Sequence, residues 1–170
     1  LIFFGYMKDK GFENGLLMDF KPHKIYYATV IEEADKGNYA ILPLLAQYKN
    51  PNDRQRINKL LKDNLKKAGA CSYEACDAIS NWNDPAFEWY AKAACQATIK
   101  QEDYYAGDIL QLLCAYPAPW SYQILKELLT QKGDYSNSDT AKDYLTELYK
   151  TRPVPPIFKP LYDMYVARKK

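Results

Sequence analysis

Apolar side chains recur along most of the chain at intervals of three or four residues, the spacing of one face of an α-helix. The pattern is clear in YAILPLLAQY (39–48) and in AGDILQLLCAY (106–116). Glycine is scarce, with 7 in 170 residues, and β-branched residues are few, which favours helices over a β-sandwich or barrel. The sequence therefore predicts an all-α chain of one domain.

The helical pattern returns with a period of 34 residues. Tyr48, Trp82 and Tyr116 lie 34 residues apart, and each is followed three residues later by a proline. Small or apolar residues keep the same period in five further columns: Leu42, Cys76, Leu110; Leu45, Ile79, Leu113; Ile57, Ala91, Leu125; Leu60, Ala94, Leu128; and Leu61, Cys95, Leu129. A fixed period of this length indicates stacked structural repeats.

The sequence of each unit predicts two helices joined by a short turn. In the first two units the turns are Asn50–Pro51 and Asp84–Pro85, which suit a helix start because Asn or Asp caps the free N–H groups and proline fits the first helical position. Gly69 and Gly133 stand where helices end. The second helices are predicted over 51–67, 85–100 and 119–132.

The ends of the chain fit the repeat less well. A fourth first helix is predicted over 138–150, capped by Ser138 or Asp139, with a partner over 157–167; another helix is predicted over 22–36. The prediction is a single domain over 1–170. It divides into an irregular N-terminal cap and helix (1–37), three helix pairs (38–137) and an atypical C-terminal pair (138–170).

The first unit, ILPLLAQYKNPNDRQRINKLLKDNL (41–65), resembles a HEAT repeat. That family has a leucine-rich first helix, a turn with a proline and an acidic residue, and a second helix that opens with arginine. Pro51, Asp53, Arg54 and Arg56 stand in the corresponding region.

The second unit keeps the Asp84–Pro85 turn but lacks the arginine, and the third keeps the proline and the leucines. The resemblance implies a short right-handed α-solenoid of about four antiparallel helix pairs. In that family the second helices line a concave surface, which usually binds protein.

Charge and histidine content narrow the functional classes. The chain has 23 basic and 21 acidic residues, a net charge of +2 that argues for neither nucleic acid nor an anionic membrane as the partner. No apolar run approaches the roughly 18 residues of a membrane span.

Catalytic Ser-His or Cys-His pairs need histidine as the base. The single histidine, His23, is predicted to be a surface or capping residue at a helix start. We therefore predict no catalytic residue, no metal and no cofactor.

The four cysteines fit no zinc pattern and leave two alternatives. They are buried thiols of a cytoplasmic protein, or two disulfides of an exported one. Antiparallel pairing within the second unit sets Cys71 opposite Cys95, and Cys76 and Cys114 lie on neighbouring first helices. Cys71–Cys95 with Cys76–Cys114 is therefore geometrically feasible, as one of three connectivities. Because disulfides form in oxidising compartments, this feasible pairing slightly favours an exported protein over a cytoplasmic one.

A candidate interaction surface emerges when the positions that face away from the core are compared between the units. If residues 57, 60 and 61 face the core, then 55, 58 and 62 face away, and their equivalents include a tryptophan, lysines and glutamines. Exposed tryptophan beside cationic residues is typical of binding hot spots. The predicted surface comprises Trp89, Lys92, Gln96, Tyr122, Gln123 and Lys126. In the competing interpretation, Trp89 packs onto the neighbouring helix as core.

The favoured function is a non-enzymatic protein-binding module: an adaptor, an inhibitor or an immunity-type protein. One alternative is nucleic-acid binding by the basic helix 54–67, which is disfavoured because Asp53 and Asp63 dilute its charge and later units do not continue it. The other is a small-ligand binder or enzyme with a pocket between repeats lined by some of the 16 tyrosines.

Overall fold

The computed structural model describes residues 23–69, 72–101, 104–131 and 137–167, and these residues form helices and no strands. The all-α prediction is confirmed for this part of the chain. The predicted cap over residues 1–21 lies outside the described residues. None of the described helices has the length and apolar character of a membrane span.

The helices follow the predicted order, and most boundaries differ by one or two residues. After α3 (Lys24–Asp35) come four pairs, and four of the eight members of these pairs begin or end in a short 3₁₀ or π turn. The members of the pairs are η1 (Tyr39–Ile41) with α4 (Leu42–Gln47), then η2 (Pro51–Asp53) with α5 (Arg54–Ala68); α6 (Tyr73–Trp82), then η3 (Pro85–Phe87) with α7 (Glu88–Thr98); α8 (Gly107–Ala115), then α9 (Pro119–Thr130); and α10 (Asn137–Leu148), then α11 (Lys159–Leu161) with the π-helical η4 (Tyr162–Val166).

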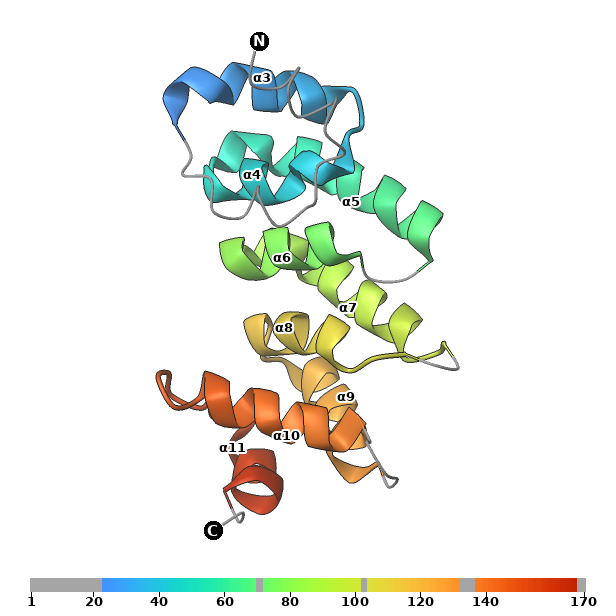
Figure 1. Ribbon diagram of the computed structural model, residues 1–170, viewed down its shortest axis with the longest axis vertical. Helices are drawn as coiled ribbons and strands as arrows, with labels where there is room; N and C mark the ends of the chain where they lie inside the picture. Colours follow the sequence, from blue (N-terminus) through green and yellow to red (C-terminus); the bar gives the residue numbers. More distant parts are fainter. Residues whose placement is uncertain (1–22, 70–71, 102–103, 132–136, 168–170) are drawn as a thin grey trace.

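The pairs follow one another along the long axis of the molecule (Figure 1). Among the first helices, α4 packs on α6, α6 on α8 and α8 on α10, and among the second helices α5 packs on α7. The first helices thus form one continuous row, and the second helices α5 and α7 present neighbouring surfaces beside it.

Local capping starts the second helices as predicted. The Asn50 side chain accepts a hydrogen bond from the backbone N–H of Asn52 at 3.1 Å, and Asp84 accepts one from Ala86 at 3.0 Å. The prolines that follow occupy the first turn, where their missing N–H has no intrahelical partner. His23 caps α3 in the same way, as predicted, by accepting from the N–H of Ile25 at 3.3 Å.

The end of α5 is also as predicted, whereas the start of α10 is not. Gly69 ends α5 with φ of 65°, a left-handed conformation that favours glycine. Ser138 and Asp139 do not cap α10, because the helix begins at Asn137 and both residues lie within it. The Ser138 hydroxyl instead donates to the carbonyl of Leu129 at 3.0 Å, so a contact with α9 overrides the local capping preference.

The core is built from the columns of the sequence repeat. All fifteen residues of the five apolar columns are buried, none more than 3% exposed. Phe87 and Tyr90, in the second unit, are fully buried beside them. Tyr116, from the aromatic column, donates its hydroxyl to the carbonyls of Ile79 and Asp84, each at 3.1 Å, and so ties the third unit to the second.

The predicted disulfide pairing is wrong. Cys95 and Cys114 are free thiols, and each belonged to one of the two expected bridges. Cys114 lies beside Tyr149 of the C-terminal unit, a neighbour that the sequence register did not indicate. Burial raises the pKa of both thiols, that of Cys114 to about 12. Cys76 is buried as its column predicts, and Cys71 lies outside the described residues.

Candidate functional site

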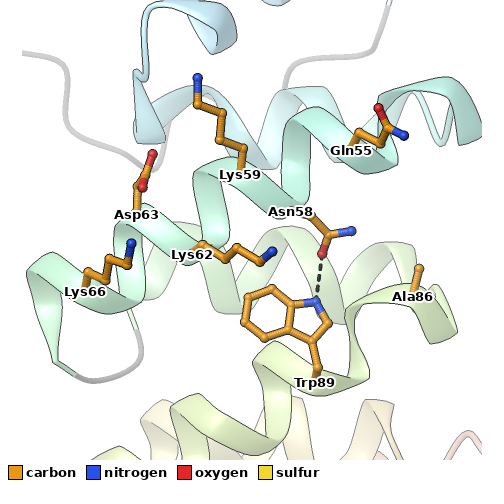
Figure 2. Close-up of a pocket in the computed structure, with 8 residues that line it drawn as sticks. All are labelled: Gln55, Asn58, Lys59, Lys62, Asp63, Lys66, Ala86 and Trp89. Atoms are coloured by element: carbon orange, nitrogen blue, oxygen red, sulfur yellow. Dashed lines mark hydrogen bonds between the residues drawn. The ribbon is translucent and has the colours of Figure 1, made fainter.

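An open groove of about 590 Å³ runs between the second helices α5 and α7 (Figure 2). We call it the α5–α7 groove. One wall belongs to α5 and carries most of the polar side chains; the other belongs to the η3–α7 start. The lining residues are Gln55, Asn58, Lys59, Lys62, Asp63 and Lys66 on the first wall and Ala86 and Trp89 on the second.

Trp89 is held in place without being part of the core. Its indole N–H donates to the side-chain oxygen of Asn58 across the groove at 2.7 Å, the dashed line in Figure 2. The ring meets Tyr90 edge-on, with 5.8 Å between centroids, and Trp89 stays 37% exposed. Each sequence interpretation of Trp89 is thus partly right, because the residue leans on the neighbouring helix and still presents a surface to solvent.

The other residues of the predicted surface lie on the same layer of helices. Lys92 and Gln96 are exposed on α7, and Gln123 and Lys126 are exposed on α9. Tyr122 is half-buried and packs against the core. The structure brings Trp89 together with a wall of α5 that the predicted surface omitted. The spacing of Lys59, Lys62 and Lys66 was the signal for that wall, because residues three and four apart share one side of a helix.

Half of the basic residues of helix 54–67 are engaged within the protein. Arg54 makes an ion pair with Asp84 at 2.7 Å. Arg56 pairs with Asp35 at 2.6 Å and with Asp53 at 2.8 Å. Lys67 lies over the ring of Tyr39, 4.9 Å from its centroid. Arg54 holds the first pair to the second, Arg56 holds α5 to α3, and Lys67 braces the two helices of its own pair, so these cations have a structural role.

Asp53 is the buried centre of the turn that leads into α5. Only 2% of the residue is exposed, and its carboxylate accepts hydrogen bonds from the Tyr27 hydroxyl at 2.6 Å and from Arg56 at 2.8 Å. Burial and the neighbouring carboxylate raise the pKa of Tyr27. The aspartate and the arginine that carry the resemblance to HEAT repeats therefore fix α3 to the start of α5.

Lys59, Lys62 and Lys66 differ from these engaged cations, although Lys59 lies near enough to Asp35 to help lower the pKa of that carboxyl. Within the part of the chain that the structure describes, none of the three takes part in an ion pair. All three are exposed and line the α5–α7 groove. The only acidic residue among the described groove lining is Asp63, so the lining carries three positive charges and one negative charge.

A second hollow, of about 290 Å³, lies where α6, α8 and α10 meet the segment after α10. Tyr144 and Tyr149 line it, as the small-ligand alternative expects of a pocket between repeats. Cys114 also lines it, but the raised pKa keeps its thiol neutral near pH 7, which does not suit a nucleophile. The described residues contain no cluster of three or more His, Cys, Asp or Glu side chains that could hold a metal ion.

Asp77 beside this hollow makes stability depend on pH. The residue is 6% exposed and accepts hydrogen bonds from Asn81 at 2.7 Å and Gln111 at 3.4 Å, and burial raises its pKa above the ordinary value of 3.8. A raised folded pKa means that the folded state holds this proton more tightly than the unfolded chain does. The contribution of Asp77 to stability is therefore present below pH 3.8 and is lost as the pH rises through the folded pKa.

We accordingly expect Asp77→Asn to raise Tm at pH 7, because the amide keeps both hydrogen bonds without the buried charge, and to leave Tm close to wild type at about pH 3. Calorimetry at both pH values measures the difference. Glu127→Gln, at an exposed carboxylate, is the control and should change neither Tm. A lower Tm for Asp77→Asn at pH 7 would mean that the fold stabilises the charge.

Comparisons with protein-family models, with curated proteins and with solved structures gave no match, so the functional assignment rests on the chain's own residues.

Proposed function

We propose that the protein is a short right-handed α-solenoid of HEAT-like helix pairs that binds another protein through its second helices. The regular succession of helix contacts, the buried columns and the repeated Asn or Asp cap before a proline support the solenoid arrangement. Solenoids commonly use the surface formed by successive repeats to hold a partner.

The observation that carries the binding proposal is Trp89. A tryptophan fixed by a hydrogen bond and an edge contact loses little conformational freedom on binding, and it offers a large contact area. The surrounding lysines and glutamines provide the polar rim that usually surrounds such an anchor. Nucleic-acid binding is less well supported because both arginines of α5 already hold carboxylates.

Affinity capture from the native host's lysate and secreted fraction tests the proposal. Wild type is compared with a Trp89→Ala/Lys92→Ala/Lys126→Ala variant, and circular dichroism confirms that both fold. We expect the variant to bind the retained partner at least about 30-fold more weakly, because loss of one hot-spot anchor costs about 2 kcal/mol or more.

The matched control removes one tyrosine and two lysines from first helices and their ends, as Tyr73→Ala/Lys142→Ala/Lys150→Ala. It should retain the partner with wild-type affinity. Equal binding by all three proteins would place the interaction elsewhere. Nucleic acid as the retained species, lost from the second-helix variant, would replace the proposal with the nucleic-acid alternative.

A further inference from the structure

We propose that the segment of the partner bound in the α5–α7 groove is an extended, acidic peptide whose carboxylates alternate with apolar side chains. This inference depends on the proposed function and adds the chemistry of the partner. It comes from the difference between the two walls of the groove and from which of their charges are already paired.

The first step concerns charge. On the second helices and their turns, Asp84 is neutralised by Arg54. Glu88 and Glu127 accept from the neutral side chains of Trp120 at 2.8 Å and Gln123 at 3.1 Å, keep their charge, and lie outside the groove lining. The groove itself contains three lysines and one aspartate. The site is therefore positive although the whole chain carries only +2, and a partner with carboxylates complements it.

Further lysines lie beyond the groove on the next second helices. Lys92 and Lys126 are exposed, occupy equivalent positions 34 residues apart, and form no ion pair with another described residue. A long acidic segment therefore meets further cations on α7 and α9. The positive electrostatic field of the lysines speeds the association of such a segment, and the contacts add binding energy.

The second step concerns geometry. Lys59, Lys62 and Lys66 recur at three and four residues on one side of α5, over a rise of about 10 Å. An extended peptide advances about 3.3 Å per residue and points alternate side chains to opposite sides. Carboxylates at alternate positions, about 6.6 Å apart, match the lysine row within the reach of the flexible lysine chains.

The intervening side chains of such a peptide face the other wall. There the groove presents Ala86 and the exposed surface of the Trp89 ring (Figure 2). Both are suited to leucine-sized or aromatic side chains. The Asn58 oxygen is occupied by the indole N–H, which leaves the Asn58 amide N–H groups to donate to a peptide carbonyl.

The same features favour a peptide over single-stranded nucleic acid. Proteins that bind single strands stack successive bases on several aromatic faces. Trp89 is the one aromatic residue among the described lining of the groove, and its edge is tied to Asn58. Arg54 and Arg56, which could bind phosphates in a bidentate manner, are committed to aspartates.

Fluorescence anisotropy with three short fluorescein-labelled probes tests the inference. The probes are a peptide that alternates glutamate with leucine, one that alternates lysine with leucine, and an oligothymidylate. We expect the glutamate peptide to bind the full chain and the other two to bind at least about tenfold more weakly. Stronger binding of the lysine peptide or of the oligothymidylate would overturn the inference, as would absence of binding by the glutamate peptide.

Two variants test the contribution of each wall of the groove separately. Lys62→Gln/Lys66→Gln should weaken binding of the glutamate peptide about tenfold at low salt and less at high salt, because exposed charges are screened. Trp89→Ala should weaken it about tenfold at both salt concentrations. Lys142→Gln/Lys150→Gln, on and just after α10, is the charge-matched control and should bind as wild type. Unchanged binding by either groove variant would contradict the proposed placement.

The two proposals fail in different ways. If no acidic probe binds but capture of the native partner still depends on Trp89, Lys92 and Lys126, the binding surface stands and only its acidic specificity is wrong. If capture is unaffected by those residues as well, the proposed function fails too.

Discussion

Replacing Tyr90 with alanine is expected to lower the free energy of unfolding by about 3–5 kcal/mol, the largest effect that we predict for one side chain. Tyr90 is fully buried between α5 and α7, and its hydroxyl donates to the side-chain oxygen of Asn64 at 2.9 Å. The change leaves a large cavity and also removes the donor to a buried amide. Urea denaturation followed by circular dichroism measures the loss.

Two further variants divide this effect. Tyr90→Phe keeps the ring and leaves the buried Asn64 oxygen without its donor, so we expect a loss of about 1–2 kcal/mol. Trp89→Ala, one residue away but facing the groove, should cost about 1 kcal/mol or less. If Trp89→Ala destabilises the protein as much as Tyr90→Ala, then Trp89 is a core residue and the binding proposal loses its anchor.

The second large effect is expected at Asp84. Its carboxylate caps η3 through the N–H of Ala86 and holds Arg54 of the preceding unit, at 2.8 Å from Nε and 2.7 Å from Nη2. We expect Asp84→Ala to lower the free energy of unfolding by about 2–3 kcal/mol, from the lost cap and the lost charge-assisted hydrogen bonds. The cost stays below that of a fully buried pair because Arg54 is 46% exposed and water can solvate it.

A double-mutant cycle with Arg54→Ala isolates the link between the units. We expect Arg54→Ala alone to cost less than Asp84→Ala, and the double variant to cost less than the sum by about 1 kcal/mol. Asp139→Ala, which removes a 56%-exposed partner of Lys142, should change stability by less than about 0.5 kcal/mol. Strict additivity of the Arg54 and Asp84 changes would mean that the ion pair does not couple the units.

The helices could be predicted from sequence because their signals are local. The second helices start at Asn50–Pro51 and Asp84–Pro85, where Asn or Asp caps the helix and proline fixes φ in the first turn. The buried side of each helix follows from the helical periodicity of the apolar columns. The start of α10 could not be predicted in this way, because Ser138 bonds to a carbonyl of α9 that no local rule brings near.

The candidate site was predicted in part for the same physical reason. Which side of α7 is exposed follows from periodicity, so Trp89, Lys92 and Gln96 were identified. The facing wall, formed by Asn58, Lys62 and Lys66, could not be predicted in this way. It depends on how α5 packs beside α7, and the spacing of residues in a single sequence does not reveal that packing. The wrong cysteine pairing has the same origin, because Cys114 turns toward Tyr149 of the C-terminal unit.

The polar contacts between the first two units also have a mechanical consequence. Arg54 with Asp84 and Asn58 with Trp89 join the start of α5 to the η3–α7 start, and Asn64 with Tyr90 adds a third link further along α5. We therefore expect the groove to be most rigid at the Trp89 end and most adjustable in width near Lys66. Segments of different thickness would then enter from the lysine end while Trp89 keeps its position.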